Sequence, residues 1–238
     1  MVRRALRAGV GAKTRPDPRE RWALGLEVII VSFVTWAWTI PTTIWTRFAP
    51  PASGHPIAGA VTAYRLGFAL RDAAFAALIL YLIWRSAGSL EPAGLVRLRW
   101  WKELPTAGAV LVASAIVALM AGLLAHAAHL PTWATDVIGE TTDRLIPIYL
   151  FISALAEELI FRAYLITRLE QLLGRTGWAV LVSATLFAGY HVSSPARSLV
   201  LLLLGLLWGG VFATWRRLPR LVLAHWAWNL FVVYSRHL

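Results

Sequence analysis

The feature that most constrains this chain is a series of long apolar runs separated by short polar connections. There are seven: residues 24–41, 66–84, 105–126, 145–167, 178–193, 198–215 and 220–235. A helix needs about 20 mostly apolar residues to cross the hydrocarbon core of a bilayer. Hydrophobic residues make up 58% of the chain and charged residues only 15%, whereas a soluble domain carries roughly 25% charged residues. The sequence therefore predicts an all-α polytopic membrane protein, with about seven transmembrane helices in one bundle.

Proline and glycine mark the connections between these runs. Pro41 and Pro105 fall at the edges of two runs, and a Gly-Arg-Thr-Gly turn covers residues 174–177. Such residues favour turns and helix ends, so we expect helices to begin or end at them. No internal repeat accompanies the pattern, which indicates one continuous membrane domain.

Positive charge concentrates in alternate connections. Residues 1–23 carry seven Lys or Arg, the connections 85–104, 168–177 and 216–220 are also basic, and 127–144 is acidic. Because cytoplasmic loops hold the excess of Lys and Arg, we predict a cytoplasmic N-terminus and an external C-terminus.

The net charge of +11 has the same explanation, together with attraction to anionic lipid headgroups. No nucleic-acid-binding motif accompanies it, so nucleic acid is not an expected partner. The chain has no cysteine, which excludes disulfides and thiolate metal sites and is compatible with a bacterial cell membrane.

Three charged residues interrupt the fourth apolar run, in the stretch AEELIFRAYL at residues 156–165. At the bilayer centre they would together cost about 8–10 kcal/mol. Glu158 and Arg162 are four residues apart, with the carboxylate first, and form a favourable helical pair. Glu157 points about 100° away from Glu158 and has no local partner. Two interpretations remain: Glu157 serves proton transfer, or both glutamates only hold the bundle together.

Further polar residues occur in later runs. His191 follows Phe187 in LFAGYH, and His225 and Asn229 share one helical face in AHWAWN. A carboxylate and a histidine that activate water, with N–H donors that stabilise an oxyanion, are the groups needed to hydrolyse a carbonyl compound.

Taken in order, Glu-Glu-x-x-x-Arg, Phe-x-x-x-His and His-x-x-x-Asn on separate predicted helices resemble the motifs of the CPBP family. This family comprises intramembrane proteases related to the CAAX prenyl endopeptidase, and bacteriocin-processing and self-immunity proteins. The resemblance covers about residues 145–232 and includes the spacing of Gly205 and Gly209. Ala163 stands where the family often has glycine, which leaves the packing there slightly looser.

The resemblance implies a role for each motif residue. Glu157 and His191 would activate water, His225 and Asn229 would form the oxyanion site, and Glu158 and Arg162 would be the orienting pair. Together with the charge pattern and the apolar runs, it divides the chain into three parts within one continuous membrane domain. These are a basic cytoplasmic N-terminal segment (1–23), accessory transmembrane helices (24–140) and CPBP-like catalytic helices (141–235).

The same residues permit two versions of the chemistry. Glu157, His191 and His225 could hold zinc with an open coordination position. The His-Glu-x-x-His motif of soluble zinc proteases is absent, and Asn229 suits an oxyanion donor better than a zinc ligand. We therefore expect a metal-free, glutamate-type protease without a cofactor. Its expected partners are a membrane-associated peptide or protein substrate and the lipid bilayer.

Two functions of other classes stay open. A non-catalytic membrane factor, which binds a partner or confers immunity, would use the motif residues only for its fold. A proton-coupled transporter also places Glu, His and Arg in the membrane, but it usually shows inverted repeats or broken helices, and the sequence shows neither.

The remaining polar and aromatic residues have ordinary explanations. Arg71 and Asp72 are expected to snorkel to the interface, and His126 and His129 to lie at the interface where the third helix ends. Tryptophans near the run ends, Trp208 among them, are expected to form an aromatic belt.

The predicted depths of the two site histidines conflict with a shared site. The predicted spans place His191 about 20 Å, but His225 only about 7 Å, from the cytoplasmic ends of their helices.

Overall fold

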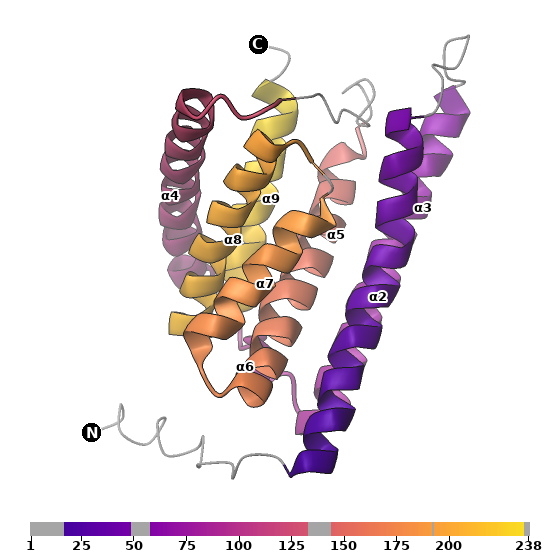
Figure 1. The fold of residues 1–238 in the computed structure, drawn as a ribbon, viewed down its shortest axis with the longest axis vertical. Coiled ribbons are helices and arrows are strands. Elements are labelled where there is room, and N and C mark those ends of the chain that lie inside the picture. Colours follow the sequence, from indigo (N-terminus) through magenta and orange to yellow (C-terminus); the bar gives the residue numbers. More distant parts are fainter. Residues whose placement is uncertain (1–16, 49–57, 133–143, 192, 236–238) are drawn as a thin grey trace.

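Helices account for nearly all of the chain that the computed structural model describes, namely residues 17–48, 58–132, 144–191 and 193–235. The α-helices are α2 (Pro18–Phe48), α3 (Ala58–Ala87), α4 (Trp100–Ala127), α5 (Ile146–Glu158), α6 (Thr167–Leu173), α7 (Thr176–Tyr190), α8 (Pro195–Trp215) and α9 (Leu218–Tyr234). A π-helix, η2 (Leu159–Ile166), joins α5 to α6, and a short 3₁₀ helix, η1 (Glu91–Ala93), follows α3. Since α5, η2 and α6 are continuous, these ranges contain seven helical rods and no strand (Figure 1).

These rods coincide with the seven apolar runs, so the predicted all-α membrane fold is confirmed. By length and composition, three described helical stretches could cross a membrane: Arg65–Ala87, Trp100–Ala127 and Pro195–Trp215. The apolar helix Thr176–Tyr190 is shorter. The acidic residues of the 127–144 connection and residues 1–16 of the basic segment lie outside the described ranges.

Two prolines do not bound helices, contrary to the prediction. α2 continues through Pro41 to Phe48, and α4 begins at Trp100 and contains Pro105. A proline inside a helix removes one backbone hydrogen bond, which membrane helices tolerate when neighbouring groups satisfy the freed carbonyl. The glycine of the 174–177 turn behaves as expected, because Gly174 has a left-handed backbone (φ 69°) and ends α6.

The rod α5–η2–α6 occupies the middle of the bundle. α5 contacts α3 on one side and α9 on the other, while α7 packs on η2, α6 and α8. α4 covers α8 and α9 from the far side (Figure 1). The two adjacent glutamates end α5, so this arrangement places them among the helices that carry the predicted histidines.

Close packing of α7 against α8 depends on two glycines. A methyl group at Gly205 would lie 3.1 Å from the Cα of Ala184, and one at Gly209 would lie 2.9 Å from Cγ1 of Val180. Small residues let helix backbones approach in this way in membrane proteins. The glycine spacing therefore brings α7 and α8 together.

A buried ion-pair cluster joins the beginnings of α4 and α9. Glu103, which has no exposed surface, accepts hydrogen bonds from Arg217 and from Nε of Arg220, the latter at 3.1 Å. The N–H of Leu218 donates to the carbonyl of Gly94 at 3.0 Å. Since His225 lies two turns further along α9, this cluster fixes its depth in the bundle.

Candidate active site

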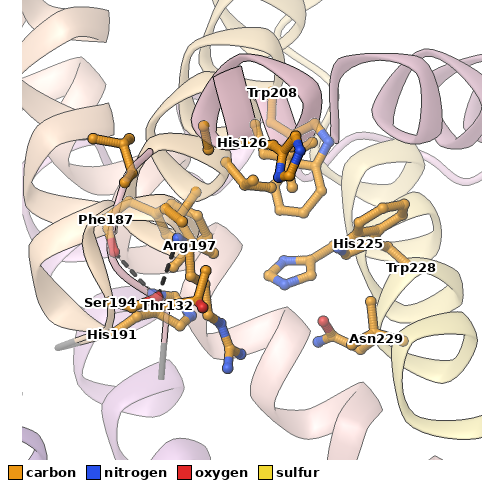
Figure 2. A pocket seen from close by; sticks show the side chains of 18 of the residues that line it. His126, Thr132, Phe187, His191, Ser194, Arg197, Trp208, His225, Trp228 and Asn229 are labelled. Carbon is orange, nitrogen blue, oxygen red and sulfur yellow. Dashed lines mark hydrogen bonds between the residues drawn. The ribbon is translucent and has the colours of Figure 1, made fainter. Parts of the chain in front are cut away.

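A cavity of about 650 Å³ lies among α4, α7, α8 and α9. Its lining includes His191, His225 and Asn229 together with Phe187 and Trp208 (Figure 2). The exposed His126 and His129, from the end of α4, line the same cavity. Residues of the second and third predicted motifs thus line the same cavity.

Glu157 meets both histidines beside this cavity. Its Oε2 lies 3.8 Å from Nε2 of His191 and 3.7 Å from Nε2 of His225. Its side chain is 11% exposed, and Oε2 is buried without a hydrogen bond from the described residues. These distances exceed a direct hydrogen bond and suit groups that share a bridging water. The structure therefore brings one residue from each of the three motifs together.

The backbone of α7 orients His191. This residue caps the C-terminus of α7, and its Nδ1 lies 2.9 Å from the carbonyl oxygen of Phe187. A carbonyl only accepts, so Nδ1 carries the hydrogen and donates it. Nε2 of the neutral ring then presents its lone pair on the side of Glu157.

Glu158 and Arg162 orient the second histidine. Nδ1 of His225 lies 2.9 Å from Oε1 of Glu158, and the same oxygen lies 3.0 Å from Nη1 of Arg162. Glu158 has no exposed surface, Arg162 is 1% exposed and His225 is 3% exposed. An ionised Glu158 accepts the Nδ1–H of His225, which turns Nε2 towards Glu157.

Aromatic rings enclose the buried guanidinium of Arg162. Its Cζ lies 4.4 Å from the ring centroid of Phe187 and 5.2 Å from that of Trp208. Cation–π attraction in such a dry site is worth up to about 2 kcal/mol. Phe187 thus serves the site by stacking on the charge that pairs with Glu158.

Sequence reasoning missed two residues of this site. Trp208 was expected in the aromatic belt, which is wrong: it is 1% exposed and its ring lies 4.4 Å from that of His225. The hydroxyl of Ser153 donates to Oε1 of Glu157 at 3.2 Å. No sequence signal singled out Ser153, although its position one turn before Glu157 is a usual place for a partner.

Asn229 lies one turn after His225 on α9 and lines the cavity beside it (Figure 2). Its amide can donate hydrogen bonds to a substrate oxygen. All six predicted site residues are therefore located at or directly behind one cavity: Glu157, Glu158, Arg162, His191, His225 and Asn229.

The donor chemistry of Glu157, His191 and His225 resembles that of a zinc site with one open position. Among the described residues, no group of three or more His, Asp or Glu side chains forms a recognisable metal-binding cluster. The distances from Oε2 to the two Nε2 atoms fit a proton-transfer cluster.

Comparison with known proteins finds a family match for the later part of the chain. Residues 143–231 match the family model described as type II CAAX prenyl endopeptidase Rce1-like. No curated protein and no solved structure matches the chain significantly. The matched segment contains every residue of the Glu157–His191–His225 cluster and its orienting pair. The predicted resemblance is thus found again over residues 143–231, which are similar to the Rce1-like family of type II CAAX prenyl endopeptidases.

Proposed function

We propose that the protein is an intramembrane endopeptidase that hydrolyses a peptide bond of a membrane-associated substrate. The observation that carries this proposal is the approach of Oε2 of Glu157 to both imidazole Nε2 atoms, at 3.8 and 3.7 Å, beside a cavity. The family match supports a protease. Glu157 and His191 then activate the water that attacks the substrate carbonyl.

The first chemical step forms a carbon–oxygen bond. Water, held by Glu157 and His191, gives one proton to Oε2 of Glu157 while its oxygen adds to the carbonyl carbon. The carbonyl oxygen becomes an oxyanion, which accepts hydrogen bonds from the amide of Asn229 and from Nε2–H of a protonated His225. Glu158 accepts the Nδ1–H of His225 and stabilises that imidazolium.

The second step breaks the carbon–nitrogen bond. The tetrahedral intermediate collapses to a carboxylic acid, and the proton held by Glu157 passes to the departing amine. Glu157 returns to its ionised form for the next cycle. Every proton is accounted for by the side chains and the one water that is consumed.

The cavity suits an apolar peptide segment. Its lining includes Val200, Leu201 and Leu204 of α8 and Val232 of α9. The family description makes a peptide with a prenylated CAAX end the natural probe. We place the protein in a bacterial cell membrane with its N-terminus in the cytoplasm, as the charge pattern indicates.

Chelation tests the metal-free version of this chemistry. Purified protein in liposomes should cleave a quenched fluorescent prenylated CAAX peptide equally well before and after exhaustive chelation, with zinc present at well below one ion per chain. Loss of cleavage on chelation and recovery with added zinc would reverse this assignment.

A comparison of membranes tests the function in cells. Membranes that contain the wild-type chain should show new peptide termini near bilayer segments, and membranes that contain Glu157→Gln at equal abundance should lack them. Identical termini in both membranes, with a cellular phenotype that survives Glu157→Gln and His191→Ala, would instead support a non-catalytic immunity or partner-binding factor.

A further inference from the structure

The imidazole of His225 needs more than one contact to hold its orientation. Its Nδ1 lies 2.9 Å from Oε1 of Glu158, and one hydrogen bond leaves a ring able to tilt about the line that joins the two atoms. Nε2 lies off that line, 3.7 Å from Oε2 of Glu157, so a tilt of the ring moves it. A second contact must therefore fix the plane of the ring.

The indole of Trp208 supplies this contact. Its ring centroid lies 4.4 Å from that of His225, with the two planes tilted by 39°. The same indole lies 5.2 Å from Cζ of Arg162, the cation that pairs with Glu158. Trp208 is buried and lines the cavity together with His225 (Figure 2). It thus contacts both side chains that Glu158 joins.

A hydroxyl group on α4 fixes the indole in turn. Nε1 of Trp208 donates to Oγ of Ser114 at 2.8 Å, and this hydroxyl donates its own hydrogen to the carbonyl of Val110 at 2.8 Å. Ser114 has no exposed surface, and a buried N–H is costly to leave without an acceptor. The contacts Ser114–Trp208–His225 therefore run from α4 through α8 to α9.

We propose that Trp208 is a positioning residue of the proposed hydrolysis, which holds the imidazole of His225 so that Nε2 faces Glu157. Ser114 extends this support to α4, a helix that lies outside the segment similar to the Rce1-like family. The inference rests on the proposed function, because it concerns the part that His225 plays in that reaction.

Substitutions separate the ring face of Trp208 from its N–H. Trp208→Leu removes the flat face and leaves space beside His225, so it should lower kcat about thirtyfold with KM unchanged, within the range for a reacting group that shifts by about 1 Å. Trp208→Phe keeps an aromatic face and has no N–H to satisfy, so kcat should stay within about threefold of wild type. Ser114→Ala leaves the buried N–H without its acceptor and should lower kcat about fivefold.

A double-mutant cycle tests whether Trp208 acts through His225. His225→Ala alone should lower kcat about 10²–10³-fold, the usual effect of removing one oxyanion donor. Addition of Trp208→Leu or Ser114→Ala to His225→Ala should cause no further loss, because the side chain that they orient is already gone. Independent effects would multiply instead.

Trp226→Leu is the matched control. Trp226 follows His225 on α9, donates its Nε1–H to the carbonyl of Pro147 at 2.9 Å, and packs edge-on against Phe151 with ring centroids 5.7 Å apart. This variant removes the same kind of ring and the same kind of hydrogen bond from the bundle. Because it leaves the ring face of His225 covered, kcat should stay within about threefold of wild type even where the unfolding temperature falls.

The experiment measures kcat and KM for the prenylated CAAX peptide in liposomes, with thermal unfolding on the same samples. Losses that multiply in the cycle, equal losses of kcat in Trp208→Leu and Trp226→Leu, or a rise in KM without a fall in kcat would each overturn the inference. If Trp208→Leu does not fold, Ser114→Ala in the wild-type and His225→Ala backgrounds decides.

Failure of the proposed function gives a different result from failure of this inference. A wild-type chain that does not cleave the probe, or a Glu157→Gln chain that cleaves it at the wild-type rate, removes the proposed function and this inference with it. Cleavage that depends on Glu157 but not on Trp208 removes the inference alone.

Discussion

Glu157 and Glu158 are neighbours in the sequence but have different surroundings. Glu158 has no exposed surface and contacts both Arg162 and His225. Glu157 accepts one hydrogen bond from Ser153, and its other oxygen lies near Nε2 of both His191 and His225. One carboxylate compensates a buried charge, and the other lies near two imidazoles.

This difference predicts opposite effects on stability. Glu158→Gln leaves the buried guanidinium of Arg162 without its anionic partner and should destabilise the fold by about 3–5 kcal/mol. Glu157→Gln keeps shape and hydrogen-bonding capacity and should change stability by less than about 1 kcal/mol. Thermal unfolding in one detergent compares the two variants. Equal unfolding temperatures would mean that Arg162 does not depend on Glu158.

At this scale the sequence predicted the charged residues better than their partners. Glu157, Glu158 and Arg162 are conspicuous because charge is costly in an apolar helix. Ser153 and Trp208 are ordinary residues of membrane helices. Ser153 lies one turn before Glu157 on α5, whereas only the packing of α8 and α9 places Trp208 beside His225. Asp72 was expected at the membrane interface, but its side chain is only 8% exposed, because its burial depends on how α3 packs against the neighbouring helices.

Among the elements, α7 explains how two histidines at unequal predicted depths share one site. It contains 15 residues and is therefore about 22 Å long, shorter than the hydrocarbon core of about 30 Å. Figure 1 shows it crossing the bundle obliquely. His191 at its end thus meets His225, which lies near the middle of α9. A run of apolar residues predicts the length of a helix but not its tilt in the bundle.

The π-helix was also absent from the prediction. η2 follows Glu158 directly and contains Arg162, and such segments often occur at functional sites. Its sequence, LIFRAYLI, is apolar apart from Arg162, so its pattern does not distinguish π from α hydrogen bonding. The neighbouring helices decide its geometry, since its eight residues are all buried.

The contact between α7 and α8 gives a prediction with an internal control. Gly205→Ala places a methyl group 3.1 Å from the backbone Cα of Ala184, which cannot move aside without shifting α7. It should destabilise the fold by about 1–3 kcal/mol and lower cleavage, since α7 carries His191. Gly210→Ala meets nothing within 4 Å and should be neutral or stabilise by up to about 1 kcal/mol. Unfolding temperatures check both variants, and similar values would contradict the proposed packing.

The whole molecule alternates direction from one rod to the next (Figure 1). The connection between α6 and α7 and the one between α8 and α9 lie at one end of the bundle, whereas α4 and α7 finish at the other. The first end carries the basic residues Arg175, Arg216 and Arg217. This arrangement agrees with the predicted alternation of basic connections. That alternation could be seen in the sequence because it depends only on which connections contain Lys and Arg.

The absence of native cysteine allows a direct test of orientation. Thr176→Cys and Ala128→Cys introduce single thiols at exposed positions near opposite ends of the bundle. A membrane-impermeant maleimide should label Thr176→Cys only in inside-out vesicles and Ala128→Cys only in right-side-out vesicles. The reverse pattern would place the N-terminus outside the cell.

The central claim is that Glu157 of α5 activates water for hydrolysis between His191 and His225. The most direct measurement is kcat for the prenylated CAAX peptide in liposomes, for wild type and for Glu157→Gln, with unfolding temperatures measured on the same samples. The account predicts that Glu157→Gln unfolds at the wild-type temperature and loses a factor of about 10²–10⁴ in kcat, the usual contribution of a general base. A folded Glu157→Gln that cleaves the peptide within a few-fold of the wild-type rate would contradict it.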